Sequence, residues 1–217
     1  MDDLIEKNEE IIGKLYEYIN HKYIYFTINK ELINIGDLEY IEIVKSGIEK
    51  FNDKKIYIDT SAVSQCNITD NTYIITYDDR PSRANMQPKA NTIWFAKLKE
   101  SPKYIIVKNS STRLINNCIF STGFMGLQSD ANIINYLYAL VLNKSFNDQK
   151  DSSSTGATMM GINNDIFNSI KVPNVSKDEA TYFGQSIENY IQLIINLKEK
   201  NYILKQIKQT LLSKYFD

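Results

Sequence analysis

The C-terminal part of the chain carries a repeat of apolar residues that only a long helix can use. Apolar side chains recur every seven residues, and no proline interrupts the chain after Pro173. Ser176 and Glu179 have the spacing of a capping box, which satisfies free N–H groups at the start of a helix. The pattern predicts a coiled-coil-like helix of about 38 residues, about 57 Å long. Its seam residues are Phe183, Tyr190, Leu197, Leu204 and Leu211.

The sequence also predicts an amphipathic helix at residues 2–26. Acidic side chains fall in its first turn, where they complement the helix dipole. Ile5, Ile12 and Ile19 recur every seven residues, and Phe26 continues the series. The apolar residues form one continuous stripe along the helix. Because such a stripe is unfavourable in water, we expect this helix to lie against another element.

The segment between the two helices has the pattern of a β-rich domain. Short runs rich in Ile, Val, Tyr and Phe alternate with clusters of turn-forming residues at roughly even spacing. An apolar helix packed on the sheet is expected at residues 130–146, and a polar loop separates it from a short return at residues 165–173. Strands are expected at residues 40–44, 55–59, 73–77, 92–98, 104–108 and 117–121.

These elements predict an α+β fold in three parts. An N-terminal helix occupies residues 1–28, a β-rich domain residues 29–175, and a long C-terminal helix residues 176–217. With 217 residues, 43% of them hydrophobic, the chain can bury one substantial core. No apolar run approaches the roughly 18 residues of a membrane span, and no signal peptide is recognisable. We therefore expect a cytoplasmic protein without membrane contact.

The sequence contains none of the motifs that indicate an enzyme. The single histidine, His21, lies on the acidic N-terminal helix, where a surface role is expected. No Walker loop, Rossmann glycine motif, HExxH motif or metal-ligand spacing is present. Cys66 and Cys118 have no CxxC or histidine-rich neighbourhood, and we expect both to be buried free thiols. We therefore predict no catalytic residue and no metal site. An enzyme of unknown type would have carboxylates as candidates, namely Asp59, Asp78 and Asp79.

The positive charge of the chain is concentrated in one window. The net charge is −1, and residues 1–50 carry eleven acidic and six basic side chains. Residues 80–113 carry eight basic side chains against Glu100 alone, and all three arginines lie there. Such a patch on a near-neutral protein is typical of a face that meets phosphates. A solvated lysine-rich sheet face is the alternative.

Within this window, residues 78–88 (DDRPSRANMQP) combine two arginines with serine, asparagine and glutamine. The two prolines are expected to keep the stretch out of regular secondary structure. The planar fork of arginine matches guanine or a phosphate, and asparagine and glutamine match adenine in the same way. The stretch is therefore suited to reading DNA. The alternative is a polar turn in which Asp78 or Asp79 pairs locally with Arg80 or Arg83.

The order of several stretches is as informative as any single motif. PSRANMQPKANTIWFAKLK is followed by CIFSTGFMGLQ, an apolar helix with NYLYALVLN, STGATMMGINNDIFNSIKVPNVS, and the final LKQIKQTLLSKYF. Together with the leading helix, this order resembles the DNA specificity subunit of type I restriction-modification systems over nearly the whole chain. In that family a target recognition domain carries the β-rich part, and long helices act as spacers that pack antiparallel to one another.

The chain departs from the family in one respect. Family members usually carry two target recognition domains, each followed by a spacer helix, whereas this chain has one of each. It therefore looks like a half-size subunit, and the resemblance implies a homodimer that reads two identical half-sites in inverted orientation. A spacer helix of about 57 Å would place the half-sites on the order of one and a half turns of duplex apart.

The resemblance also implies partners. In the family the specificity subunit performs no chemistry. It recruits methylation subunits, which use S-adenosylmethionine to methylate adenine, and a restriction subunit driven by ATP with magnesium. We therefore expect double-stranded DNA, a methylation subunit and a restriction subunit as partners, and no cofactor in this chain. The alternative is a truncated fragment that binds a partner subunit through its helices but has lost useful DNA binding.

Candidate residues follow from these considerations. The first DNA-contact candidates lie at residues 80–89, and the second group lies in the loops STGFMGL and SSSTGATMMG, where small residues allow close approach to a ligand. The DNA-contact candidates are Arg80, Ser82, Arg83, Asn85, Gln87 and Lys89, then Thr122, Gly156, Ala157 and Thr158. The candidates for helix contacts with a second copy or a partner are Ile12, Ile19, Tyr190, Leu197, Leu204 and Leu211.

Overall fold

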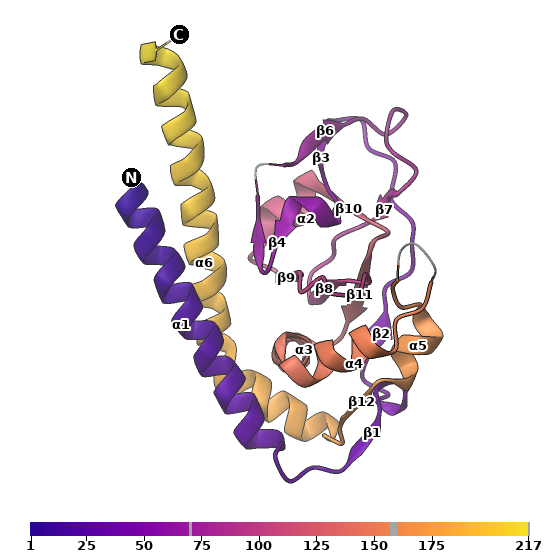
Figure 1. Cartoon of the computed structure of the whole chain (residues 1–217). Helices are drawn as coiled ribbons and strands as arrows, with labels where there is room; N and C mark the ends of the chain where they lie inside the picture. Colours follow the sequence, from indigo (N-terminus) through magenta and orange to yellow (C-terminus); the bar gives the residue numbers. More distant parts are fainter. Residues whose placement is uncertain (70, 157–159, 217) are drawn as a thin grey trace.

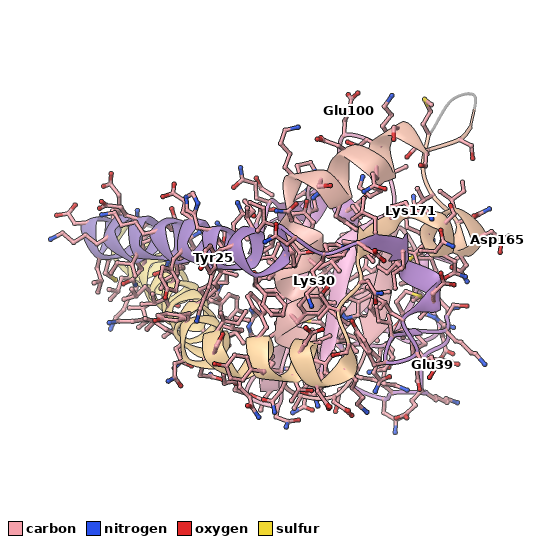
Figure 2. The ribbon with its side chains drawn as sticks, turned by 90° about the horizontal axis from the view of Figure 1, so that it is seen from below. Tyr25, Lys30, Glu39, Glu100, Asp165 and Lys171 are labelled. Atoms are coloured by element: carbon pink, nitrogen blue, oxygen red, sulfur yellow. The ribbon has the colours of Figure 1, made fainter. Side chains whose placement is uncertain are left out.

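Two long helices form one side of the molecule. The fold is seen in a computed structural model that describes residues 1–69, 71–156 and 160–216. Helix α1 (Asp2–Thr27) and helix α6 (Lys177–Phe216) run side by side in opposite directions, and both chain termini lie at the same end of the pair (Figure 1). Seen from below, the pair projects to one side of the domain, and Asp165 lies on the far side (Figure 2). Both helices were predicted from the seven-residue repeats.

The register of the helix pair is fixed along its whole length. Near the chain termini, Lys208 Nζ lies 2.7 Å from the carboxylate of Asp2. At the other end, the rings of Phe26 and Phe183 stack with their centroids 4.8 Å apart. Between them, the predicted stripe residues of α1 are buried against α6. The repeats therefore encode an antiparallel pair within one chain.

An asparagine in the apolar seam of α6 has a matching partner. Asn8 Nδ2 donates to Asn201 Oδ1 at 2.6 Å, and both side chains are buried. A buried amide without a hydrogen-bond partner destabilises the folded state. The two asparagines can bond to each other only when the helices have this alignment. The pair therefore opposes sliding of α1 along α6.

The domain contains two four-stranded sheets. Strands β3 and β10 pair in parallel, and the other pairings are antiparallel. The first sheet, ordered β6-β3-β10-β7, comprises β6 (Tyr73–Ile75), β3 (Lys55–Ile58), β10 (Cys118–Ser121) and β7 (Ala84–Met86). The second, ordered β2-β11-β8-β9, comprises β2 (Glu42–Ile43), β11 (Phe124–Gln128), β8 (Thr92–Ala96) and β9 (Tyr104–Val107). The six predicted strands are therefore present, although β7 and β11 were not predicted as strands.

Shorter elements connect these sheets to the helices. Strands β1 (Leu32–Asn34) and β12 (Lys171–Pro173) pair where the chain enters and leaves the domain. The others are η1 (Ile35–Asp37), η2 (Thr60–Ala62), β4 (Val63–Ser64), β5 (Asn67–Ile68), α2 (Thr112–Asn117) and α5 (Asn164–Ser169). Among the described residues, no helix is long and apolar enough to cross a membrane.

The helix expected at residues 130–146 is divided in two. Helix α3 (Ile133–Leu142) ends before Asn143, and α4 (Lys144–Ser152) begins after it. Asn143 has extended backbone angles, and its side chain accepts a hydrogen bond from Ser145 N at 2.9 Å. The prediction of one helix was wrong because an asparagine that caps a new helix does not interrupt the hydrophobic pattern.

Helix α3 lies between the second sheet and the helix pair (Figure 1). Its residues are buried on every side up to Val141, and the largest core cluster joins α1, α3, α6 and the second sheet. Gly184 of α6 makes this packing possible, because a Cβ there would lie 1.8 Å from the backbone oxygen of Asn132. The core thus crosses both predicted domain boundaries. Both cysteines are buried and free, as predicted.

Candidate nucleic-acid interface

Residues 78–88 contain a short strand, contrary to the expectation that prolines would exclude one. Strand β7 pairs with β10 through Ala84 and Met86, which are buried. Pro81 and Pro88 flank this strand instead of interrupting it, and Pro81 O accepts a turn hydrogen bond from Ala84 N at 2.8 Å. Proline is compatible with a strand when its missing N–H falls outside the ladder. The strand gives the polar stretch a fixed position at one edge of the first sheet.

Arg83 lies beside the turn between β10 and β11. Its carbonyl oxygen accepts hydrogen bonds at 2.9 Å from the backbone N–H groups of Thr122 and Asn85. Its guanidinium lies over Gly123, with one nitrogen 2.7 Å from where a Cβ of that residue would be. The side chain is exposed, and within the described part of the chain no carboxylate forms an ion pair with it. Two predicted residues, Arg83 and Thr122, are thus brought together.

Arg80 has a different environment. Its guanidinium lies 4.1 Å from the ring centroid of Tyr77 and donates to the carbonyl oxygen of the same residue. The side chain is half-buried. The local turn considered as an alternative therefore describes Arg80, although its partner is a tyrosine. Among the described residues, neither Asp78 nor Asp79 forms an ion pair with an arginine.

The segment at Lys97 contacts both loops that contain the second group of candidates, residues 121–127 and residues 152–161. Its backbone N–H donates to Gly123 O at 3.0 Å, and its carbonyl accepts from Ile162 N at 3.1 Å. Next to it, Leu98 and Gly161 form an isolated β-bridge. Partial burial, together with the positive charge of Arg83, holds the pKa of the Lys97 ammonium below its ordinary value. In the sequence, Lys97 is only one of the eight basic residues in the window 80–113. No sequence pattern indicates that its backbone bonds to both Gly123 and Ile162.

A cleft with a volume of about 690 Å³ opens beside Lys97. Its floor is formed partly by Met86, Phe124 and Met125, which are buried. The polar residues that line it are Lys45, Ser46, Lys97, Thr122 and Asn164. An apolar floor with cationic and hydroxyl groups around it can receive a sugar-phosphate strand, because the strand brings both negative charge and apolar sugar surface.

The remaining candidates are dispersed. Ser82 and Lys89 are exposed, and Asn85 is half-buried. Gln87 Oε1 is buried and has no hydrogen-bond partner in the described part of the chain, so this oxygen does not face a ligand at the surface. Gly156 is exposed and has a φ of +126°, which favours glycine. Ala157 and Thr158 lie outside the described residues.

The helix candidates divide into inner and outer positions. Ile12 and Ile19 are buried inside the α1–α6 pair, so they are already used within one copy. Tyr190, Leu197 and Leu204 are half-buried. Of these, Leu197 and Tyr190 pack against the core at its margin, and Tyr190 also contacts the ring of Tyr18. Leu211 lies beyond the ion pair of Asp2 at the start of α1 and is 41% exposed. Contacts between copies therefore need a surface other than the inner seam.

Comparison with known proteins identifies the fold. No family model and no curated protein matches the sequence. The chain is similar to the HsdS subunit from Thermoanaerobacter tengcongensis (17% identity, TM-score 0.53), covering 85% of this chain and 47% of that one. It is also similar to the type I restriction-modification S subunit from M. genitalium (18% identity, TM-score 0.55), covering 100% of this chain and 57% of that one. The chain has the fold of these subunits and spans about half their length.

Proposed function

We propose that this chain is the DNA-recognising specificity subunit of a type I restriction-modification system. The observation that carries the proposal is the cluster of Arg83, Lys97 and Thr122 around Gly123, at the edge of the first sheet. The fold that holds this cluster is shared with two S subunits. The chain contributes recognition, while methyl transfer and DNA cleavage belong to partner subunits. Elsewhere in the protein some partly buried cations have a carboxylate partner, as in the ion pair of Arg113 with Glu199.

Cations at this edge without an ion-pair partner among the described residues favour the binding of nucleic acid. Each lysine or arginine that meets a phosphate releases condensed counterions, so affinity for duplex DNA falls steeply with salt. Arg83 also has the donors to contact a base edge in the major groove. The neighbouring Arg80 is held differently, because its guanidinium stacks on the ring of Tyr77 and donates to the carbonyl oxygen of that residue.

The test compares two substitutions that remove the same charge. Arg83→Ala should weaken binding to duplex DNA, and if the side chain meets a phosphate it should reduce the salt slope by about 0.9. Arg80→Ala should leave both quantities near the wild-type values. Fluorescence anisotropy with a labelled duplex, measured over a series of salt concentrations, provides the readout.

Two outcomes would contradict the proposal. Wild-type chain that does not bind duplex DNA, even with its methylation subunit, would favour the interaction-only alternative. Equal losses for Arg83→Ala and Arg80→Ala would contradict the distinction between the two arginines, since both variants remove one positive charge.

A second copy would complete the recognition of a bipartite site. Since the chain spans 47% and 57% of the two S subunits, we propose a homodimer that reads two inverted half-sites and positions methylation and restriction subunits. A row of exposed apolar residues along α1 is available for the contact. Its members, at seven-residue spacing, are Leu4, Ile11, Tyr18 and Tyr25.

Helix geometry places this row away from the domain. The hydroxyl groups of Tyr16 and Tyr138 of α3 are 3.0 Å apart, so Tyr16 faces the domain. Tyr18 is two residues later, which is a rotation of about 200° around the helix. Its ring lies 4.8 Å from that of Tyr190 on α6, so the row continues onto the second helix. In Figure 2, Tyr25 marks the end of the row near the domain.

The dimer is tested by two matched substitutions on α1. Ile11 and Ile24 are both 43% exposed, but only Ile11 lies in the row. Ile11→Glu should reduce the mass measured by light scattering from two chains to one, because it places a charge in the apolar contact. Ile24→Glu should leave a dimer. A wild-type mass of one chain over the whole concentration range would contradict the homodimer.

Methylome sequencing tests the complete proposal in cells. Cells that express the chain with its methylation subunit should gain adenine methylation at a symmetric bipartite motif. An asymmetric motif would contradict the homodimer but not DNA recognition. In this complex, S-adenosylmethionine, ATP and magnesium would bind the partner subunits.

A further inference from the structure

We infer that Gly123 and Lys97, with Arg83, form a seat for one phosphate of the DNA backbone. This inference rests on the proposed function and specifies which chemical group of the DNA meets this part of the edge. It assigns a role to Lys97 as a contact residue, and to Gly123 as a residue that positions the Arg83 guanidinium.

Gly123 provides the space in which the guanidinium lies. A Cβ at this position would come within 2.7 Å of Arg83 Nη2 and 3.1 Å of Thr60 Cγ2. The backbone around Gly123 is held by two hydrogen bonds, one from its N–H to Ser121 Oγ and one from Lys97 N–H to its carbonyl. The glycine therefore cannot move away to admit a side chain, and a larger residue must displace the guanidinium.

Arg83 and Lys97 both contact Gly123. Arg83 lies over Gly123, and Lys97 is bonded to it through the backbone. Partial burial and the Arg83 charge both act against the ammonium form of Lys97, so its pKa lies below the ordinary value. Two neighbouring cations repel each other, and an anion placed between them would relieve the repulsion.

One acidic group that acts on Arg83 also caps a short helix. Asp59 interacts electrostatically with Arg83. Its carboxylate accepts hydrogen bonds from Ser61 N at 2.8 Å and from Ala62 N at 3.1 Å, which cap η2. No ion pair links it to Arg83. The positive charge of the pair is therefore only partly balanced within the described part of the chain.

These features favour a phosphate over a base at this position. A base edge offers hydrogen-bond acceptors but no net charge, so it would relieve little of the repulsion between the two cations. A phosphate carries a full negative charge and several acceptor oxygens, and arginine and lysine are its usual partners. Thr122 lines the cleft next to Lys97 and adds a hydroxyl donor to the same site.

The experiment uses the full chain and a labelled mixed-sequence duplex of about 30 base pairs, because phosphate contacts do not depend on sequence. Lys97→Met removes the ammonium while keeping an unbranched side chain, and it should reduce the salt slope by about 0.9. Gly123→Ala should also reduce the slope, because it displaces the guanidinium of Arg83. The matched control is Lys144→Met, which removes an exposed lysine on α4 and should leave the slope unchanged.

A double variant separates positioning from general damage. In the Arg83→Ala background there is no guanidinium to displace, so Gly123→Ala should cause no further loss of DNA affinity. A further loss comparable to that of Gly123→Ala alone would show that the glycine acts otherwise and would overturn its positioning role. Thermal unfolding of each variant checks that the contact of the new Cβ with Thr60 leaves the fold intact.

The remaining outcomes distinguish this inference from the proposed function. If the wild-type chain binds the duplex and Lys97→Met has the wild-type salt slope, the phosphate seat is wrong while DNA recognition stands. If the wild-type chain shows no salt-dependent affinity for the duplex, even with its methylation subunit, the proposed function fails, and the seat fails with it.

Discussion

Two cations on the helix side of the domain and two at the proposed recognition edge differ in whether a carboxylate pairs with them. On the helix side, Lys108 Nζ lies 2.9 Å from Glu188 Oε2, and Arg113 lies 3.1 Å from Glu199 Oε1. At the edge, Arg83 and Lys97 form no ion pair with any described residue. The ion pairs of Lys108 and Arg113 teach that cationic charge alone does not mark a binding surface. The proposed interface is distinguished by cations whose charge the fold balances only in part.

The two sides also differ in what occupies the space above a glycine. At Gly184 a Cβ would meet the backbone of Asn132, whereas at Gly123 it would first meet the flexible end of Arg83. A side chain at Gly184 would therefore require the backbone to move, whereas a side chain at Gly123 could be accommodated by movement of the Arg83 guanidinium. Four predictions test this contrast, beginning with the largest expected effect.

Gly184→Ala should destabilise the protein by about 3 kcal/mol, because the new Cβ overlaps backbone that cannot move without separating α3 from α6. Gly13→Ala is the control, since a Cβ there meets nothing within 4 Å. Gly13→Ala should stabilise α1 by about 0.5 to 1 kcal/mol. Urea unfolding measures both values. Equal effects of the two substitutions would contradict the close α3–α6 contact.

Lys108→Met should cost about 2 to 3 kcal/mol. Lys108 is buried and also donates to Asn135 Oδ1 and Ala131 O, so its removal leaves several acceptors and the Glu188 charge uncompensated. The partial exposure of Glu188 keeps the cost below that of a fully buried pair. Lys14→Met, which breaks an exposed pair with Glu10, should change stability by less than about 0.5 kcal/mol in the same assay.

Glu179 should make the start of α6 sensitive to acid. A hydrogen bond from Lys30, and others from Ser176, lower the pKa of Glu179 to about 2, against an ordinary value of 4.5. Its stabilising contribution is therefore present above pH 4.5 and is lost as the pH falls from there toward 2. Solvent screening limits the contribution to about 1 kcal/mol. Urea unfolding at several pH values should show this loss in the wild type but not in Glu179→Gln, with Glu39→Gln behaving like the wild type.

Lys97→Met should have the smallest effect on stability and the opposite sign from Lys108→Met. Removing a partly buried cation that has no counter-charge should stabilise the fold by about 0.5 kcal/mol. Urea unfolding measures the change. A destabilisation as large as that of Lys108→Met would mean that Lys97 has a structural partner, and the contrast between the two sides would fail.

The helices were predictable because their information is local and repeated. The seven-residue spacing located α1 and α6, and the capping box is present, with Ser176 N donating to Glu179 Oε2 at 2.9 Å. Short helix α2 and the break at Asn143 were not predictable in the same way. Helix α2 has six residues and no side-chain cap at its start. At Asn143 a single capping side chain changes the backbone direction without changing the hydrophobic pattern.

The proposed recognition edge was only partly predictable. The concentration of arginines drew attention to residues 80–113, and the structure shows that Arg83 is exposed. The sequence could not separate Arg83 from Arg80, because the stacking on Tyr77 depends on the turn between them. Nor could it select Lys97, which meets Gly123 and Ile162 from segments distant in the sequence.

The buried asparagine pair between α1 and α6 has a consequence for how the chain folds. Asn8 and Asn201 are 193 residues apart in sequence, so the largest core cannot close until nearly all of the chain is available. Contacts of such long range carry a loop-closure cost before they contribute stability, which slows folding. During synthesis, α1 leaves the ribosome before α6 and must wait, with its apolar stripe uncovered, until α6 is available.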